Sequence, residues 1–223
     1  MELILGIDDA GRGPLIGPMI LAGCLIDKSI ESELRTLGVK DSKQVTPKRR
    51  KFLLDKIKEK AELFEVEITH PEEIDRTNHE GINLNQLEAI KVANIINKIN
   101  NGSKKIKVVI DCPSVSILKW EDYLKTKITN LSNLEISCEH KADKNHLAVS
   151  AASIIAKYIR EEEMDKLKKE FGEEIGSGYT SDHTTVKFLE KYGEKYKDSG
   201  LFRKTWATWK KAFPDPSQNK LDF

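Results

Sequence analysis

Four aspartates lie where predicted secondary-structure elements end, and not on the solvated faces of helices. Asp8 and Asp9 follow the apolar run LILGI, Asp111 ends KVVID, and Asp143 lies in EHKADKNH, between the strand-like LEISCE and a long helical pattern. In open α/β sheets ligands bind at the carboxyl ends of strands, so we expect these carboxylates to form one cluster. Such a cluster needs a counterion, and ligation by oxygen alone selects Mg²⁺ or Mn²⁺ over zinc.

Each aspartate also has an ordinary structural interpretation. Asp111 precedes Cys112 and Pro113 and suits a turn, Asp143 suits a helix cap, and Asp8 and Asp9 can cap the glycine turn that follows them. For any one aspartate taken alone, this interpretation is the better one. Together with the adjacent Gly-Arg-Gly turn, the four residues favour a metal site.

The turn itself has the sequence GRGPLIGP, residues 11–18. A dinucleotide-binding glycine loop is one alternative for it. The glycine spacing is wrong for such a loop, and Pro14 interrupts the helix that the loop would have to begin. Two acids directly before the turn would also repel a bare pyrophosphate.

Length and composition indicate one sizeable folded domain. The chain has 223 residues, 39% of them hydrophobic, and its net charge of +1 comes from 37 basic and 36 acidic residues. Any nucleic-acid binding must therefore come from local patches. No run approaches the roughly 18 apolar residues of a membrane span, and residues 1–7 are too short for the apolar segment of a signal peptide, so we expect a cytoplasmic protein. The three separated cysteines suit reduced core residues.

Hydrophobic periodicity predicts an α/β fold. Strands are expected at about residues 3–8, 18–26, 63–69, 106–111 and 134–139. Helical patterns cover residues 46–61, 83–100, 116–128 and 145–171, and the first of these begins with Thr46 as N-cap and Pro47 at the first helical position. Two strands in a row, followed by helices that alternate with single strands, predict a sheet with mixed strand directions.

The C-terminal part differs in composition. GEEIGSGYTSDH, residues 172–183, is glycine-rich and predicts a loop, and a helical tail follows it. Phe202, Trp206, Trp209 and Phe213 recur at intervals of four, three and four, which predicts an aromatic stripe on the last helix that packs on the body or on a ligand. We therefore predict a core at 1–170, a helical C-terminal part at 171–213 and a mobile tail at 214–223.

Five segments resemble, in order, the signature segments of type 2 ribonuclease H, or ribonuclease HII, and most of all its archaeal members. They are GIDDAGRGPLIGPM, LGVKDSKQVT, VVIDCPSV, HKADKNHLAVSAASIIAKYIRE and GSGYTSDH, and the resemblance covers residues 3 to about 210. It implies a ribonuclease H-like fold, a mixed five-stranded sheet flanked by helices with a small helical C-terminal part. It also implies a metal-dependent endonuclease that cuts the RNA strand of RNA–DNA hybrids. The same enzyme would nick duplex DNA 5′ to an embedded ribonucleotide, leaving a 3′ hydroxyl and a 5′ phosphate.

The resemblance assigns the family's four acids to Asp8, Asp9, Asp111 and Asp143. Asp9 departs from the pattern, because the family usually has glutamate there. Two divalent ions about 4 Å apart can activate a water on one side of the phosphate and stabilise the leaving oxygen on the other. Asp8 would bridge them, and no histidine or serine nucleophile would be needed.

Substrate contacts are expected from the turn and from the C-terminal loop. Glycine at Gly11 and Gly13, around Arg12, lets the backbone approach a sugar closely enough to contact a 2′ hydroxyl, which only RNA carries. By resemblance, Tyr179 stacks on the sugar next to the ribonucleotide, although on its own it would pass for an ordinary loop aromatic. Lys43 is our candidate for a phosphate contact. Further candidates, some of them simply solvated, are Lys40, Lys141, Lys144, Lys157 and the basic residues of 48–51.

The C-terminal SQNKLDF resembles a clamp-binding peptide. Gln218 and Leu221 are in place, and the sequence stops at Phe223, short of the usual aromatic pair. A replication sliding clamp is therefore a candidate partner of a protein that we otherwise expect to be a monomer without membrane contact.

Two alternatives stay open at this point. One is a non-catalytic hybrid-binding protein whose metal site Asp9 has disabled. The other is a type 3 ribonuclease H, which usually carries an extra N-terminal domain and lacks the Gly-Arg-Gly form, neither of which is found here. The sequence gives neither the metal preference nor a choice between primer removal and ribonucleotide repair.

Overall fold

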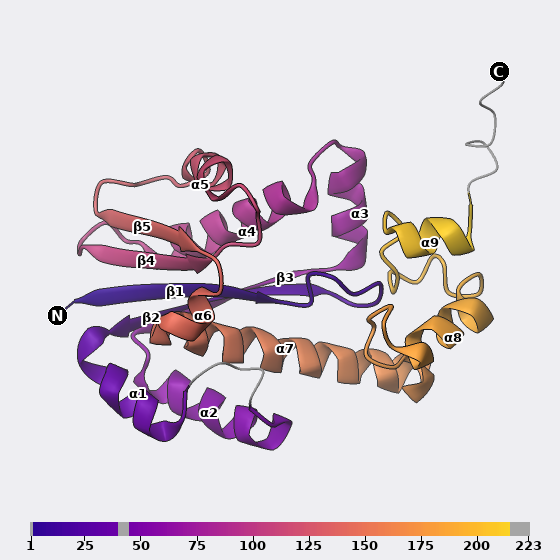
Figure 1. Ribbon diagram of the computed structural model, residues 1–223, viewed down its shortest axis with the longest axis horizontal. Helices are drawn as coiled ribbons and strands as arrows, with labels where there is room; N and C mark the ends of the chain where they lie inside the picture. The colour runs from indigo at the N-terminus through magenta and orange to yellow at the C-terminus, as the bar shows by residue number, and fades with distance from the viewer. Residues whose placement is uncertain (1, 40–44, 215–223) are drawn as a thin grey trace. The chain divides into compact units, whose positions relative to one another are not determined.

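A mixed five-stranded sheet forms the centre of the fold. The computed structural model describes residues 2–39 and 45–214. The strands are β1 (Leu3–Ala10), β2 (Met19–Asp27), β3 (Leu63–Thr69), β4 (Ile106–Asp111) and β5 (Leu134–Glu139), in the order β3-β2-β1-β4-β5 (Figure 1). β1 pairs antiparallel with β2 and parallel with β4, and β4 pairs parallel with β5. The predicted fold class is confirmed.

The helices fall between and after the strands. They are α1 (Glu31–Leu37), α2 (Pro47–Lys60), α3 (Pro71–His79), α4 (Leu84–Ile99), α5 (Ile117–Lys125), α6 (Ala142–Asn145), α7 (Leu147–Phe171), α8 (His183–Tyr192) and α9 (Ala207–Ala212), with short 3₁₀ helices at Lys28–Ile30 and Glu173–Ile175. Periodicity predicted α2, α4, α5 and α7. It missed α1, α3 and α6.

Local capping explains where two of the predicted helices begin. The Thr46 side chain accepts a hydrogen bond from the amide of Arg49 at 3.3 Å, and Pro47 occupies the first helical position of α2, as expected. At α4 the side chains of Asn83 and Gln86 each accept from the other's backbone amide, at 3.1 and 3.0 Å. This reciprocal capping box satisfies two amides that the helix leaves unpaired.

By its internal contacts the chain divides into two compact units. Unit 1 comprises residues 1–10, 20–68 and 83–160, and unit 2 comprises residues 11–19, 69–82 and 161–223. Unit 1 therefore holds nearly the whole sheet, and unit 2 holds the glycine turn, α3 and the C-terminal helices. The domain boundaries predicted after residues 170 and 213 stay predictions, and the predicted tail lies, apart from residue 214, outside the described residues.

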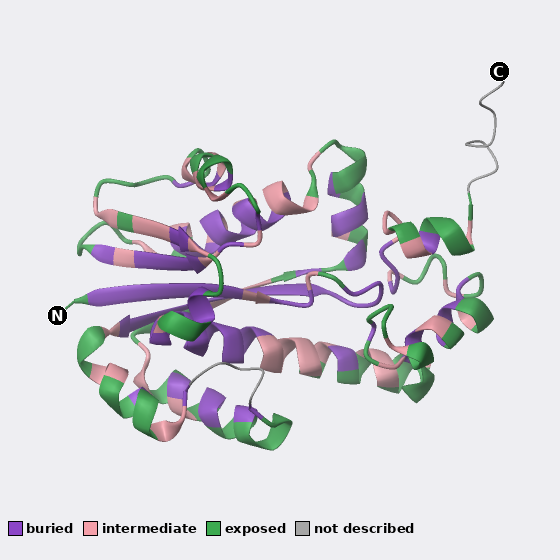
Figure 2. Cartoon of the chain, in the orientation of Figure 1, coloured by how far each residue is buried: buried purple, intermediate pink, exposed green. Residues whose placement is uncertain are grey.

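The core of unit 1 depends on a close approach between β1 and α7. A Cβ on Gly6 would overlap the backbone of Ala148 and Val149, so only glycine allows this contact. The facing segment of α7 is rich in small residues that are fully buried, namely Ala148, Ala151, Ala152 and Ala156. Figure 2 shows the resulting burial, with β1 and β2 almost entirely covered. On the other side of the sheet, Gly23 of β2 lies against Ile95 of α4.

Unit 2 has an aromatic core of its own, formed by Phe188, Phe202, Trp209 and their neighbours. The predicted helical stripe is wrong in its geometry. Phe202 forms an isolated β-bridge with Ile16, Trp206 is the N-cap of α9, and Phe213 is its C-cap. The rings still pack together, at 4.9 Å between the centroids of Phe202 and Trp209. The aromatic spacing therefore marked a core, and not one helix.

The predicted loop at 172–183 is confirmed up to Asp182, the N-cap of α8, with left-handed backbone at Gly172, Gly176 and Gly178 around the short 3₁₀ helix. The three cysteines are buried and unpaired, as expected. In the described ranges, none of the helices has both the length and the apolar character that a membrane crossing requires.

Candidate active site

Asp8 and Asp9 lie at the end of β1 but belong to opposite faces of the sheet. Side chains alternate along a strand, so Asp8 shares a face with Ile4 and Gly6, against α7, and Asp9 does not. Asp8 is only 6% exposed, whereas Asp9 is half-buried. The amide of Asp9 donates to Asp8 Oδ1 at 2.7 Å, which orients the buried carboxylate.

Three of the four predicted carboxylates come together. Ligand oxygens of Asp8, Asp111 and Asp143 all lie within 4.8 Å of one another. Because β1 and β4 are parallel, with Ile7 opposite Ile110, the residues that follow these two reach the same edge of the sheet. Asp143 comes from α6, which begins three residues after β5 ends.

The backbone conformation at the start of α6 places Asp143 at this edge of the sheet. Lys141 has φ of 58°, in the left-handed region, and it is the only described residue other than glycine with positive φ. The next amide, that of Ala142, donates to Asp111 Oδ1 at 3.4 Å. The backbone at Lys141 thus has a conformation that residues other than glycine rarely adopt. Together with the bond from Ala142, it connects α6 to the end of β4.

The cluster is electrostatically unfavourable without a cation. Burial raises the pKa of Asp8 well above its ordinary value, and the negative charges of Asp9 and Asp111 raise it further. A hydrogen bond from Ser153 of α7 opposes this rise. Three carboxylates from three separate elements form an oxygen-only donor set that fits a hard divalent cation. The residues present therefore suit the metal expected from the sequence.

Of the four carboxylates predicted to form one cluster, Asp8, Asp111 and Asp143 do so, and Asp9 lies beside them. In the part of the chain that the structure describes, Asp9 is not among the residues whose ligand atoms meet within 4.8 Å. Strand alternation explains this arrangement, and it could have been read from the sequence. Asp9 stays close enough for its charge to act on Asp8.

Sequence reasoning missed the polar residues that surround the cluster. Ser150 Oγ of α7 donates to the backbone oxygen of Asp143 at 2.5 Å, and Ser153 bonds to Asp8. His146 Nε2 lies 2.9 Å from Glu139 Oε2. The sequence did carry a signal for the two serines, because they lie three residues apart in the apolar run LAVSAASIIA, and buried hydroxyls need partners.

In unit 2, the glycine turn lies next to Tyr179. Gly11 is buried with φ of 77°, Arg12 is half-buried and Gly13 is exposed. A Cβ placed on Gly13 would be 4.0 Å from Cε1 of Tyr179, which is 39% exposed. The two predicted sugar-contacting features therefore meet in one unit. Arg203, which the sequence analysis missed, donates to carbonyl oxygens of this turn.

The predicted phosphate contacts have mixed placements. Lys43 and Lys40 lie outside the described residues, and so do Gln218, Leu221 and Phe223 of the clamp-binding segment. Lys141 and Lys144 are exposed on either side of Asp143, and Lys157 is half-buried. In the basic run, Lys48, Arg49 and Lys51 are exposed as expected, but Arg50 is buried and donates to the oxygen of Val45 at 2.8 Å.

Comparison with known proteins gives a consistent result. The family model described as ribonuclease HII matches residues 5–209. A ribonuclease HII of Methanocaldococcus jannaschii is 44% identical, over 98% of each chain. The crystal structure of ribonuclease H2 from Pyrococcus horikoshii superimposes with a TM-score of 0.82 at 38% identity, covering 94% of this chain and 96% of that one. The RNase HII in a PCNA complex from Archaeoglobus fulgidus gives a TM-score of 0.79 at 34% identity, covering 92% and 95%.

The mixed sheet and the carboxylates gathered at the edge where β1 and β4 end define the protein as an enzyme of the ribonuclease H class, a hydrolase. The chain belongs to the ribonuclease HII family.

Proposed function

We propose that this ribonuclease H cuts the RNA strand of RNA–DNA hybrids and nicks duplex DNA on the 5′ side of embedded ribonucleotides. The products would carry a 3′ hydroxyl and a 5′ phosphate. The observation that supports this most is the buried group of Asp8, Asp111 and Asp143, in a chain that belongs to the ribonuclease HII family. Cytoplasmic location is part of the same proposal.

Asp8, Asp111 and Asp143 would hold two Mg²⁺ or Mn²⁺ ions, with Asp9 as an additional, more distant acid. When bound, these ions would supply an activated water and stabilise the negative charge that develops on the phosphate. Ser153 and the amide of Asp9 keep the Asp8 carboxylate oriented, and Ser150 fixes the backbone that carries Asp143. Asp8, as the most buried of the acids on β1 and β4, is the proposed shared ligand.

Substrate choice would depend on Gly11, Arg12, Gly13 and Tyr179. A single 2′ hydroxyl is the only feature that marks one ribonucleotide in a DNA duplex, and we expect backbone groups of the turn to contact it directly. Tyr179, which is exposed and lies next to Gly13, would stack on the neighbouring sugar. Lys43 remains our candidate for a phosphate contact.

The decisive assay uses three duplexes in Mg²⁺ and in Mn²⁺: a continuous RNA–DNA hybrid, DNA with one ribonucleotide, and DNA alone. We expect cleavage of the first two and none of the third, with product ends that a DNA polymerase can extend. Asp111→Asn should abolish cleavage and leave duplex binding intact. Asp55→Asn, on the exposed face of α2, is the matched control and should behave as wild type. Binding without cleavage in either metal would favour the non-catalytic alternative.

The C-terminal segment is a separate proposal. The Archaeoglobus fulgidus relative was solved as a complex with PCNA. We propose that this chain binds its own sliding clamp through Gln218, Leu221 and Phe223. Deletion of residues 217–223 should then remove clamp binding in a pull-down with the purified cognate clamp, and unchanged affinity would disprove the contact.

A further inference from the structure

Arg203 is completely buried in unit 2, with 0% of its surface exposed, and its guanidinium collects backbone carbonyl oxygens. Nη2 donates to Gly11 O at 2.6 Å and to Gly17 O at 2.9 Å. Nη1 donates to Arg12 O at 2.6 Å, and Nε donates to Gly17 O at 3.1 Å. Burying a cation costs free energy unless hydrogen-bond acceptors surround it, and here the acceptors are carbonyl groups of the turn. These bonds therefore hold the backbone of the turn in one conformation.

Trp206 completes the same arrangement. Its indole Nε1 donates to Gly13 O at 3.1 Å, and its ring lies 5.0 Å from the guanidinium carbon of Arg203. The carbonyl oxygens of Gly11, Arg12 and Gly13 are therefore all held by two side chains that lie about 190 positions later in the sequence.

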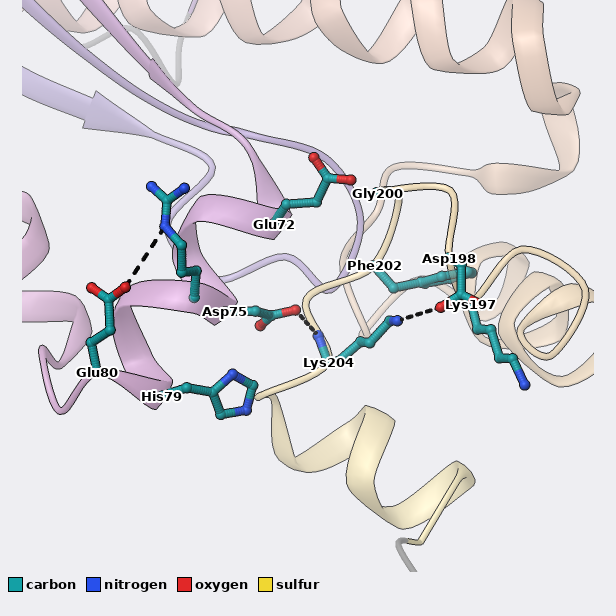
Figure 3. Close-up of a pocket in the computed structure, with 10 residues that line it drawn as sticks. Glu72, Asp75, His79, Glu80, Lys197, Asp198, Gly200, Phe202 and Lys204 are labelled. Atoms are coloured by element: carbon teal, nitrogen blue, oxygen red, sulfur yellow. Dashed lines mark hydrogen bonds and ion pairs between the residues drawn. The ribbon is translucent and has the colours of Figure 1, made fainter.

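Asp75 of α3 fixes the backbone between these two side chains. Its carboxylate accepts from the amide of Lys204 at 2.7 Å, and from the amide and hydroxyl of Thr205 at 3.0 and 2.6 Å. Figure 3 shows Asp75 aimed at Lys204, at the side of the pocket between α3 and the loop before α9. With the amide of Arg203 bonded to Leu15 O at 2.9 Å, the segment has little freedom.

The contacts also affect how the turn can bind a ligand. A peptide group whose oxygen accepts from a cation is polarised, which makes its N–H a stronger donor. The Gly11 and Arg12 carbonyls belong to the peptides that carry the amides of Arg12 and Gly13. Arg203 thus both fixes these two amides in space and strengthens them as donors to an oxygen such as a ribose 2′ hydroxyl.

We propose that Arg203, with Trp206 as its partner and Asp75 as its anchor, is a positioning residue that presents the Arg12 and Gly13 amides to the ribose. The inference rests on the proposed function, because it assumes that the turn reads the 2′ hydroxyl. It adds the residues that make the turn rigid enough to do so.

The test compares Arg203→Lys and Trp206→Phe with matched changes elsewhere. Trp120→Phe removes another indole donor, from the 2.8 Å bond to Asn85 O, and Asp55→Asn changes an exposed residue of α2. For each protein, kcat/KM is measured on DNA with one ribonucleotide and on a continuous hybrid, beside its melting temperature. The ratio of the two kcat/KM values cancels any loss of folded protein.

We expect Trp206→Phe to lower kcat/KM on the single-ribonucleotide duplex by about 2- to 10-fold, and Arg203→Lys by about 10- to 100-fold. The continuous hybrid offers many registers and should lose less, so the ratio falls in both variants and stays at the wild-type value in both controls. If Arg203→Lys does not fold, Trp206→Phe decides alone, because it removes the indole N–H and still leaves an aromatic ring at this position. An unchanged ratio in the folded variants would overturn this inference, whereas a wild-type protein inactive on single ribonucleotides would overturn the proposed function first.

Discussion

At the scale of single residues, Asp8 is held in surroundings that suit a metal ligand and not a stable fold. Burial and the neighbouring charges raise its pKa above the value it has in the unfolded chain. The folded, metal-free protein therefore binds more protons than the unfolded chain, and its stability falls as the pH rises through this window. Above the raised pKa, the full free-energy cost of keeping the Asp8 carboxylate charged and buried lowers the stability of the metal-free protein.

We therefore expect Asp8→Asn to raise the melting temperature of the metal-free protein at neutral pH while it abolishes cleavage. Each kcal/mol relieved should raise Tm by about 2–4 °C for a chain of this size. Thermal unfolding in EDTA at pH 5 and pH 8 measures the effect, which should be larger at pH 8. Asp55→Asn again serves as control, and a lower Tm for Asp8→Asn at pH 8 would contradict this account.

Asp9 should limit the activity with Mg²⁺. It is one methylene shorter than the glutamate usual in the family, a deficit of roughly 1.5 Å, and it extends from the opposite face of β1 to Asp8. Metal sites tolerate ligand errors of only about 0.2 Å. Asp9→Glu should raise the cleavage rate with Mg²⁺ more than with Mn²⁺, measured on the same hybrid. An equal or slower variant would mean that the site has adapted to aspartate.

The residues that could be predicted from the sequence were those with both a chemical type and a place at the end of an element. Asp8, Asp111 and Asp143 met this condition, and they come together. Arg203 did not, because nothing in LFRKTW tells a buried guanidinium from a solvated one. Its partners are carbonyl groups of a turn that is remote in sequence. Every residue has a backbone oxygen, so the amino-acid sequence does not show which of them will bind a guanidinium.

At the scale of elements, the contact between β1 and α7 decides how closely the sheet and the helix carrying Ser150 and Ser153 can pack. Gly6→Ala would place a methyl group inside the backbone of Ala148 and Val149, which cannot rotate away. We expect a loss of stability above the roughly 1–3 kcal/mol usual for an overpacked core. Denaturant unfolding gives the value.

Gly23→Ala is the matched control for this change. It adds the same methyl group to the neighbouring strand, but there the obstacle is the Cγ2 methyl of Ile95, a side chain. Gly23→Ala should lower the free energy of unfolding less than Gly6→Ala does. The reverse order would show that α7 yields more readily than the side chain of α4.

Periodicity located the strands and the long helices, because each has enough residues for its repeat to be visible. The same method failed for α6, a helix of four residues that depends on the left-handed Lys141 and on the bond from Ala142 to Asp111. It also misjudged the aromatic series after Phe202, since intervals of three and four arise from a folded-back segment as well as from a helix.

At the scale of the whole molecule, the metal should act as a ligand of the folded state only. The three carboxylates come from distant parts of the sequence and meet only after folding. A cation at ten times its Kd should then stabilise the protein by about 1.4 kcal/mol, a Tm increase of about 3–6 °C. Melting curves with Mg²⁺ or Mn²⁺ against EDTA measure this shift, which Asp111→Asn should abolish. An equal shift in that variant would place the binding elsewhere.

The strand order has a consequence for the time course of folding. β1 pairs with β2 through a short connection, but its other partner, β4, lies about 100 residues further along the chain. Local pairings form early, whereas distant ones must first overcome the entropy of closing a long loop. The β1–β2 hairpin can therefore exist while Asp8 still lacks Asp111, so we expect a refolding chain to pass through states that have sheet structure and no metal site. Nuclease activity should return with the slowest refolding phase, after most of the circular dichroism signal has been recovered.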